Sequence, residues 1–292
     1  MRQQSKAYLF ALATVLIWST VASAFKLSLR HISPTGLLLY SSWISAAVLG
    51  LLVLLQGKSH WLRHWTRGDY LASLGFALLN PFAYYLILFK AYALLPAQEA
   101  QPLNYTWAVT LSVLAVPLLR QRLRLLDLAG LLVSYGGAYV IATRGNVLAV
   151  EFSDPLGVGL ALGSTLIWAL YWIGSTRDGL DPTCRLFVNF CFGAVLVTGY
   201  AAWRGALAWP TPPALLGTAY VGIFEMGVTF VLWATALKLS TSAAKVSILI
   251  YLSPFLSLVF IRLFVGEAIM GSTLVGLVLI MAGIGLQQLK GK

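Results

Sequence analysis

An eight-residue motif occurs twice in this chain, and its recurrence limits the folds available to it. The segment Ala11-Leu-Ala-Thr-Val-Leu-Ile-Trp18 returns as Ala161-Leu-Gly-Ser-Thr-Leu-Ile-Trp168, with identities at the first, second, sixth, seventh and eighth places. Both copies lie in long apolar stretches. A repeat at about half the chain length indicates two related halves. We place these halves at residues 1–145 and 152–292.

The composition defines the environment of this repeat. Hydrophobic residues make up 59% of the 292 residues, and charged residues only 10%. Apolar stretches of roughly 20 residues match the thickness of the hydrocarbon core of a bilayer. Such a composition is typical of integral membrane proteins. We therefore expect an all-α membrane protein that forms a single integral domain over residues 1–292, with no soluble domain between the apolar stretches.

Ten apolar stretches are long enough to cross a bilayer as helices. We expect these spans at about residues 7–27, 34–56, 70–94, 97–119, 125–142, 155–175, 182–203, 214–237, 242–265 and 270–288. Five spans in each half is an odd number, so the second half must enter the membrane from the opposite side. The repeat is then inverted. Inverted repeats in membrane proteins are typical of secondary transporters with a binding site near the midplane, which predicts a central cavity.

Basic residues are distributed unevenly between the two sides of this arrangement. The chain carries 20 Lys and Arg residues and a net charge of +11. With the loops assigned alternately, six fall opposite the N-terminus and the remaining 14 fall on its side; the six are Lys26, Arg30, Lys90, Arg144, Arg204 and Arg262. Cations in short loops mark the cytoplasmic face. We therefore predict cytoplasmic termini, a lipid bilayer around the spans and no nucleic-acid partner.

Glycine pairs recur at a constant offset in the last span of each half. Gly130 and Gly137 are seven residues apart, as are Gly276 and Gly283. Small residues on one helix face let helix backbones approach closely in a membrane. The fifth and tenth spans are therefore expected to form scaffold or dimer contacts. The sequence leaves open whether the protein is a monomer or a homodimer.

Several of these features together resemble a known family, the drug/metabolite transporter superfamily, in its ten-helix group built from two EamA-type repeats. The features in this chain are Leu16-Ile-Trp18-Ser-Thr20, Lys26, Pro34, Leu252-Ser-Pro254-Phe, Gly266-Glu267, Gly276 and Gly283. The chain departs from the pattern where the family often has an arginine in the second helix, since it reads Tyr40-Ser-Ser-Trp43 there. It also has Gln121 at the first-half counterpart of Glu267.

Three further segments narrow the resemblance within this family. Trp18-Ser-Thr20, Asn104-Tyr-Thr-Trp107 and Ile167-Trp-Ala-Leu-Tyr171 are similar to segments of its bacterial aromatic amino acid exporters. The resemblance implies a secondary transporter of the bacterial inner membrane that exports aromatic amino acids and related amphipathic metabolites. It also implies a basket of ten helices with a central cavity.

Aromatic side chains in the spans are the candidate walls of such a cavity. A site for aromatic molecules needs flat π-faces and a few polar groups. Trp168, Tyr171 and Trp172 share one helix face because they are three and four residues apart. The other candidates are Trp18, Tyr84, Tyr85, Tyr105 and Trp107. We expect Trp18 and Trp168 to face each other. For Tyr84, Tyr85 and Trp172, ordinary core packing remains an open alternative.

Three polar residues in or near the spans complete the predicted substrate site. Glu225 lies near the middle of the eighth span, where an ionisable group is costly. It either binds a substrate amine or couples a proton, or it is a protonated or salt-bridged packing residue. Asn80, before Pro81, occupies the matching place in the third span, and paired irregularities in transporter repeats point to a binding site. Lys26 could pair with a substrate carboxylate or extend to the interface. A second hypothesis is efflux of cationic aromatic compounds, with Glu225 as the counter-charge.

Other functional classes have weak support in the sequence. His60 and His64 are four residues apart, but only Asp69 is a nearby acid, so we expect no metal site. We find no phosphate-binding Walker A sequence and no paired intramembrane acids. We therefore expect no cofactor and no enzymatic activity. A scaffold without transport activity would not need deep tryptophans or Glu225.

Overall fold

The computed structural model describes residues 2–120, 124–149, 151–175, 177–240, 246 and 248–288. All regular elements in these ranges are helices. Nine helical stretches there are long and apolar enough to cross a membrane, and a shorter apolar helix covers Leu249–Val265. The predicted start of the ninth span at Ser242 lies outside the described residues, as do Arg122, Lys245, Lys290 and Lys292 of the orientation argument. The predicted all-α membrane fold is confirmed.

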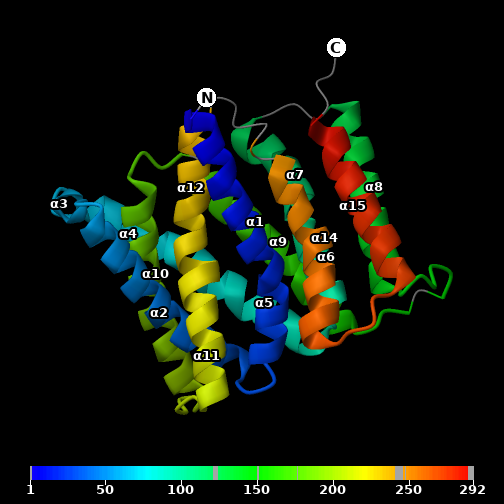
Figure 1. Ribbon diagram of the computed structural model, residues 1–292, viewed down its shortest axis with the longest axis horizontal. Helices are drawn as coiled ribbons and strands as arrows, with labels where there is room; N and C mark the ends of the chain where they lie inside the picture. Colours follow the sequence, from blue (N-terminus) through cyan, green and yellow to red (C-terminus); the bar gives the residue numbers. More distant parts are fainter. Residues whose placement is uncertain are drawn as a thin grey trace. The chain divides into compact units, whose positions relative to one another are not determined.

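The helix boundaries agree closely with the expected spans (Figure 1). The elements are α1 (Arg2–Ser28), α2 (Pro34–Leu55), α3 (Ser59–Leu62), α4 (Arg67–Ala77), η1 (Leu78–Ala83), α5 (Tyr84–Leu94), α6 (Ala97–Tyr105), α7 (Trp107–Leu119), α8 (Leu125–Ala142), α9 (Pro155–Ser175), α10 (Pro182–Trp203), α11 (Pro212–Tyr220), η2 (Val221–Val228), α12 (Thr229–Leu239), η3 (Ile248–Leu252), α14 (Ser253–Phe260), η4 (Ile261–Val265) and α15 (Gly271–Gln288).

Helix α4 begins at Arg67, one turn earlier than the sequence predicted, because a capping box starts it. The Thr66 side chain accepts a hydrogen bond from the Asp69 backbone N–H at 3.2 Å, and the Asp69 carboxylate accepts one from the Thr66 backbone N–H at 2.7 Å. These bonds satisfy two donors that a helix start would otherwise leave unpaired. Helix α2 begins as predicted, with Ser33 as the cap and Pro34 in its first turn.

The described chain packs as two compact units, and each unit takes segments from both sequence halves. Unit 1 comprises Met1–Phe82 and Gly179–Val265, and unit 2 comprises Ala83–Asp178 and Gly266–Lys292. The repeated motif contributes one copy to each unit, in α1 and in α9 respectively.

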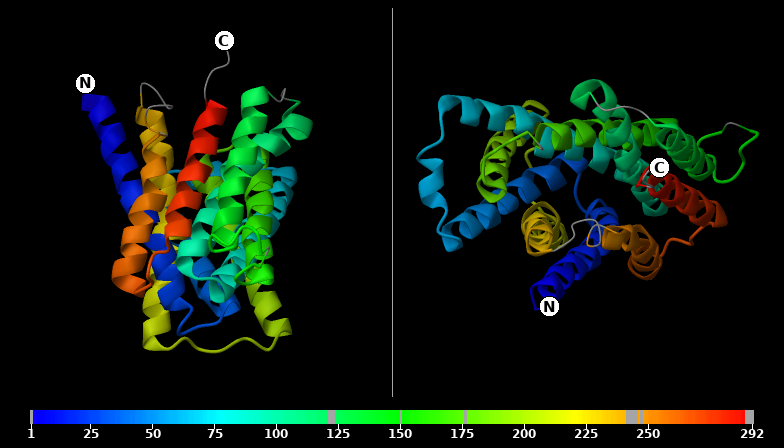
Figure 2. Two further views of the ribbon diagram at one scale, coloured as in Figure 1. Left: turned by 90° about the vertical axis from the view of Figure 1, so that its right-hand side faces the viewer. Right: turned by 90° about the horizontal axis from the view of Figure 1, so that it is seen from above.

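Matching helices pack together inside the two units. In unit 1, α1 packs against α12 and α14, and it lies between them in Figure 2 (right; α1 blue, α12 gold, α14 orange). In unit 2, α9 packs against α5 and α7. Helices α12 and α5 belong to the eighth and third spans, and α14 and α7 to the ninth and fourth. The two sets of contacts thus correspond helix by helix, which fits a 5+5 repeat. Moving the sequence halves apart as rigid bodies would break both sets.

Within unit 2, α8 and α15 form the most extensive helix pair (Figure 1). The four glycines predicted to mediate close packing lie at this contact. A Cβ atom on Gly137 would lie 2.5 Å from the Gly276 carbonyl oxygen, and one on Gly130 would collide with the Gly283 carbonyl oxygen. The scaffold function expected of these glycines therefore lies inside one chain.

Within unit 1, Arg185 joins α10 to α4. Its Nη1 donates to the Asp69 carbonyl oxygen and to Ser73 Oγ, both at 2.6 Å. The guanidinium also lies 4.8 Å from the centre of the Trp65 ring, a distance at which cation–π attraction operates. Arg185 lies at the start of the expected span 182–203, in the first turn of α10, and its side chain is buried.

At the start of α6 in unit 2, Glu267 replaces the usual side-chain cap. Its Oε1 accepts the Ala97 backbone N–H at 2.8 Å, and its Oε2 accepts that of Gln98 at 3.0 Å. The residue before the helix, Pro96, makes no side-chain cap. A carboxylate at a helix N-terminus also interacts favourably with the helix dipole. Its predicted first-half counterpart, Gln121, lies outside the described residues.

Replacing Glu267 with alanine is expected to destabilise the protein by about 2 kcal/mol, because two buried backbone donors lose a charged acceptor. Replacement by glutamine, which keeps one acceptor oxygen, should recover part of this loss. The measurement is the thermal midpoint of the purified protein in detergent, with exposed Glu151→Ala as the control. Equal midpoints for Glu267→Ala and Glu151→Ala would refute the capping function.

Candidate functional site

The third and eighth spans are irregular at corresponding places. In the third, η1 interrupts the helix at Leu78–Ala83, where Asn80 has extended backbone angles (φ −140°, ψ 117°) and precedes Pro81 through a cis peptide bond. In the eighth, η2 is a π-helical segment at Val221–Val228 that contains Glu225. π-Helical segments occur frequently at functional sites. The sequence predicted the break at Asn80 but contained no signal for the π-helix, which lacks proline.

The fourth and ninth spans are irregular as well. Helix α6 ends at Tyr105 and α7 begins at Trp107, with Thr106 as the shared cap. In the ninth span, the 3₁₀ segment Ile248–Leu252 precedes α14. Discontinuous helices in matching positions of two repeats are the strongest structural pointer to a transporter's binding site. Two of the predicted site residues, Tyr105 and Trp107, flank the break at Thr106 and are half-buried.

In unit 2, five of the predicted aromatic residues form one cluster. The Trp168 ring stacks on Tyr84 with centroids 4.4 Å apart and planes 25° apart. Tyr171 lies 5.7 Å from Trp168, in a nearly parallel orientation, and Trp172 lies 5.9 Å away, edge-on. Tyr85 contacts Tyr84 edge-on at 4.8 Å. The cluster contains the flat, parallel ring faces that an aromatic ligand would need.

A chain of hydrogen bonds adjoins this cluster. The Tyr84 hydroxyl donates to Asn104 Oδ1 at 3.3 Å, and Asn104 Nδ2 donates to Ser164 Oγ at 2.9 Å. These bonds hold α5, α6 and α9 in register and fix the orientation of the Tyr84 ring. Asn104 was identified in the sequence only as part of a family segment. Because Asn104 bonds to Tyr84 of the cluster and to Ser164 of α9, we add it to the candidate site residues.

In unit 1, Trp18 packs against rings of α12. Its ring centroid lies 6.1 Å from that of Phe230 and 6.0 Å from that of Trp233. Next to it, Ser19 Oγ donates to the Val15 carbonyl oxygen at 2.6 Å. Trp18 and Trp168, the last residues of the two motif copies, thus each pack against rings of the equivalent helix within their own unit. Their expected mutual approach stays a prediction.

Asn80 in η1 and Asn189 in α10 are both fully buried. Neither amide group has a hydrogen-bond partner among the described residues. The ring of Pro81 abuts Gly193, one helical turn after Asn189 on the same face of α10. Buried polar atoms normally have partners, so the two amides offer binding capacity for a polar ligand or water. Asn189 was missed in the sequence, although an amide inside an apolar span is a detectable signal.

The last two predicted polar residues also lie in unit 1. Glu225 is half-buried within η2, and Lys26 is half-buried in the last turn of α1. The structure therefore divides the predicted site residues between the units. Trp18, Lys26, Asn80 and Glu225 lie in unit 1, and the remaining seven lie in unit 2.

Within the described residues, no group of three or more His, Cys, Asp or Glu side chains could hold a metal ion. The paired helix breaks and aromatic clusters instead have the layout of a membrane transporter built from repeats. A model of the EamA-like transporter family matches residues 5–143 and again residues 155–287. The chain belongs to the EamA-like transporter family. It is accordingly a multi-pass membrane transporter of the drug/metabolite transporter type.

Individual relatives agree with this assignment over nearly the whole chain. The aromatic amino acid exporter YddG of Ancylobacter novellus is 25% identical over 268 residues, which is 87% of each chain. The uncharacterized transporter YvbV of Bacillus subtilis is 27% identical and covers 95% of this chain and 90% of its own. A solved crystal structure, 24% identical, matches 97% of this chain and 96% of its own with a TM-score of 0.69, which supports the fold.

Proposed function

We propose that this EamA-family transporter exports aromatic amino acids and related amphipathic metabolites across the bacterial inner membrane, with both termini in the cytoplasm. The observation that carries the proposal is the stack of Trp168 on Tyr84 at 4.4 Å, with Tyr171 nearly parallel beside it. Parallel ring faces favour offset stacking with a further ring. The similarity to an aromatic amino acid exporter points to the same substrate class.

The chemistry of such a substrate fits the remaining candidates. Its ring would bind to the aromatic faces near Trp168, and its charged ammonium and carboxylate groups need polar partners away from bulk water. In unit 2, the amide of Asn104 and the hydroxyl of Tyr84 lie beside these faces and offer such partners. Transport would proceed by alternating access, the mechanism that inverted repeats support, driven by the substrate gradient or by a coupled proton.

The test is uptake of radiolabelled tryptophan and phenylalanine into liposomes that contain the purified protein, with and without a pH gradient. We expect saturable uptake of both amino acids, competition by unlabelled aromatic amino acids and no competition by glycine. Empty liposomes and liposomes with heat-denatured protein are the controls. Absence of uptake of every aromatic amino acid, in preparations that remain monodisperse, would reject the proposed substrate class.

A second candidate function is efflux of cationic aromatic compounds. The observation that favours it is the carboxyl group of Glu225 within the π-helical segment of the eighth span, because an acid at this depth is a suitable counter-charge for a cation. Under this alternative, Glu225→Gln abolishes transport of a cationic dye. Under the proposed function, a zwitterionic amino acid that does not use Glu225 is still transported by the same variant.

A further inference from the structure

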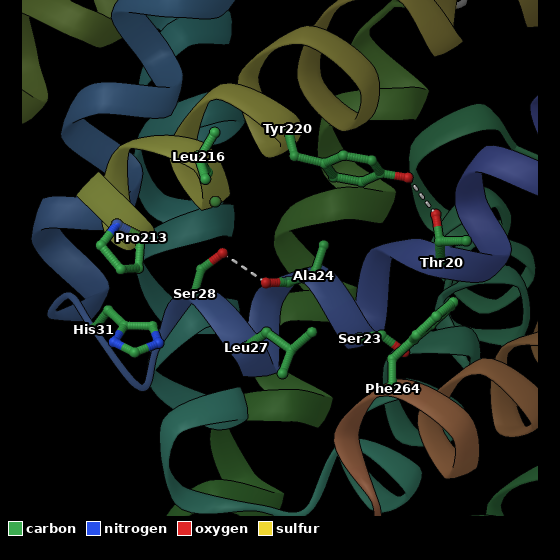
Figure 3. Close-up of a pocket in the computed structure, with 11 residues that line it drawn as sticks. Thr20, Ser23, Ala24, Leu27, Ser28, His31, Pro213, Leu216, Tyr220 and Phe264 are labelled. Carbon is green, nitrogen blue, oxygen red and sulfur yellow. Dashed lines mark hydrogen bonds between the residues drawn. The ribbon is translucent and has the colours of Figure 1, made fainter. Parts of the chain in front are cut away.

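A groove in unit 1 runs along the second half of α1 (Figure 3), with a cavity volume of about 500 Å³. Helix α1 forms its floor, α11 forms one wall, and Phe264 of η4 closes the other side. This volume lies within the range of pockets that bind small ligands. None of the predicted substrate residues lines the groove.

The groove lies on the face of α1 opposite Trp18. Successive residues of an α-helix are about 100° apart, so Thr20 and Leu27, which line the groove, are about 200° and 180° around the helix from Trp18. The three exposed leucines of the first half of α1, Leu9, Leu12 and Leu16, lie on the same half of the helix surface, away from Trp18. In a membrane-spanning chain, such an exposed apolar side faces lipid. The groove therefore continues the lipid-facing surface of α1.

The depth of the groove matches one leaflet of a bilayer. From Thr20 to Ser28, where α1 ends, the helix advances about 12 Å, and half of the hydrocarbon core is about 15 Å. The shallow end lies where α1 ends and α11 begins, next to His31 and Pro213. At the deep end, the hydroxyls of Thr20 and Tyr220 hydrogen-bond at 2.5 Å and close the groove (Figure 3).

The chemistry of the groove changes from its mouth to its interior. Ala24 and Leu27 make the interior apolar, and Leu216 of α11 adds an apolar rim. The Ser28 hydroxyl is occupied by its bond to the Ala24 carbonyl oxygen at 2.6 Å. At the mouth, His31 lines the groove and Arg30 is the neighbouring exposed cation. Arg30 Nη2 donates a hydrogen bond to the Val265 carbonyl oxygen at 2.9 Å. A guanidinium has five N–H donors and binds phosphate well.

We infer that this groove binds one acyl chain of a membrane phospholipid, with the phosphate of the headgroup at Arg30 and His31. The apolar interior and its position on the lipid side select a hydrocarbon chain. The basic mouth at the level of the interface selects an anionic headgroup rather than a neutral one. The inference concerns the opposite face of α1 from Trp18, so it does not depend on the proposed substrate.

The test places the full-length protein in phosphatidylcholine nanodiscs with a trace of phosphatidylglycerol that carries a photoactivatable group within one acyl chain. After illumination, mass spectrometry should locate the label on residues 20–31 and 213–220, above its level on the exposed residues of α8. Leu216→Trp, which fills the groove, should lower this labelling about tenfold, because displacing about two methylenes from the groove has that effect. Leu215→Trp, at the adjacent exposed position outside the groove, should not lower it.

A second pair of variants tests the headgroup. Arg30→Gln should lower labelling by the phosphatidylglycerol probe about tenfold, the usual loss for one charge-assisted hydrogen bond. It should leave labelling by a diacylglycerol with the same chain unchanged. Arg204→Gln, at an exposed position at the end of α10, is the control. Uniform labelling of all lipid-facing helices, or equal labelling of the Leu216→Trp and Leu215→Trp variants, would overturn the inference.

A Ser23 variant distinguishes binding of an acyl chain in the groove from binding of a polar ligand. Its buried hydroxyl lines the groove and has no hydrogen-bond partner among the residues that the structure describes. Ser23→Ala should leave lipid labelling unchanged, because a hydrocarbon chain forms no bond with the hydroxyl. A severalfold loss of labelling in this variant would show that the groove recognises a polar group at this depth, and the acyl-chain assignment would be wrong.

Discussion

Replacing Gly137 with leucine is expected to prevent this transporter from folding, while the same replacement at Gly136 is expected to be tolerated. Gly137 lies at the contact between α8 and α15 in unit 2, where its added Cβ would lie 2.5 Å from the Gly276 carbonyl oxygen, 2.8 Å from Leu279 Cβ and 3.0 Å from the Ile280 backbone nitrogen. Gly136 is exposed, and a Cβ there would meet nothing within 4 Å.

The expected loss of folding in Gly137→Leu follows from the atoms of α15 that a side chain at Gly137 would meet. Two of the three nearest atoms belong to the backbone of α15, so no side-chain rotation can make room. The helices would have to separate, and the contacts at Gly130 and Gly283 would loosen with them. Overpacking a close contact costs typically about 1–3 kcal/mol for the first atoms added. A leucine adds four carbon atoms, and the loss of the whole helix pair is the expected result.

The measurement is the yield and thermal midpoint of detergent-purified protein, followed by size-exclusion chromatography. Gly137→Leu should give aggregated protein or none. Gly137→Ala should give folded protein with a clearly lower midpoint. Gly136→Ala should give an unchanged or higher midpoint, since alanine is the better helix former by about 1 kcal/mol. A wild-type midpoint for Gly137→Ala would show that α8 and α15 do not pack through this glycine.

The sequence predicted the helices of this protein well because its signals are local. Apolar stretches set the spans, Ser33 with Pro34 marked the start of α2, and Asn80 with Pro81 marked the break in the third span. The start of α4 was missed by one turn, because Thr66 and Asp69 form their capping box within a stretch that reads as a polar loop. The two-copy motif predicted the repeat, and the family model accordingly matches the chain twice.

Packing between distant segments was harder to predict. Nothing near Glu267 in the sequence shows that its carboxylate caps α6, 170 positions away. The buried position of Arg185 depends on acceptors in α4, which residue type and local hydropathy do not reveal. The pairing of α1 with α12 and α14 also could not be deduced from the repeat alone, because an inverted repeat fixes which contacts correspond but not which contacts form.

The candidate site was predicted unevenly for the same reason. Helical spacing placed Trp168, Tyr171 and Trp172 on one face, and the structure groups them. The stack with Tyr84 and the bond to Asn104 join different helices and had no sequence signal. Asn189 is an amide within an apolar span, and the sequence alone does not show what lies beside it. In the structure Pro81, the residue after Asn80, contacts Gly193 one helical turn away on α10.

Replacing Trp168 with alanine is expected to raise the KM for tryptophan transport about tenfold or more, because stacking of one aromatic pair contributes about 0.5–1.5 kcal/mol beyond the area it buries. Trp168 is only 8% exposed and contacts three of the other predicted ligand residues. Its loss would remove a ring face and also release Tyr84 from its stacked orientation. Both effects weaken binding of an aromatic substrate.

A structural role alone would give a different pattern of kinetic effects. Truncating a buried tryptophan creates a cavity and costs about 3–5 kcal/mol of stability, so a purely packing residue would lower the amount of active protein and leave KM unchanged. Trp168→Phe keeps a ring in the cavity and should restore stability, while KM for tryptophan stays severalfold above wild type. Trp203→Ala is the matched control, because Trp203 is 78% exposed on α10.

The assay therefore reports KM and maximal rate separately, in liposomes with protein content determined for each variant. The proposed function requires that Trp168→Ala and Trp168→Phe raise KM, in that order of severity, and that Trp203→Ala matches wild type. If both Trp168 variants lower the maximal rate in proportion to folded protein while KM stays constant, the stack on Tyr84 only stabilises unit 2, and the aromatic substrate must bind elsewhere in the chain.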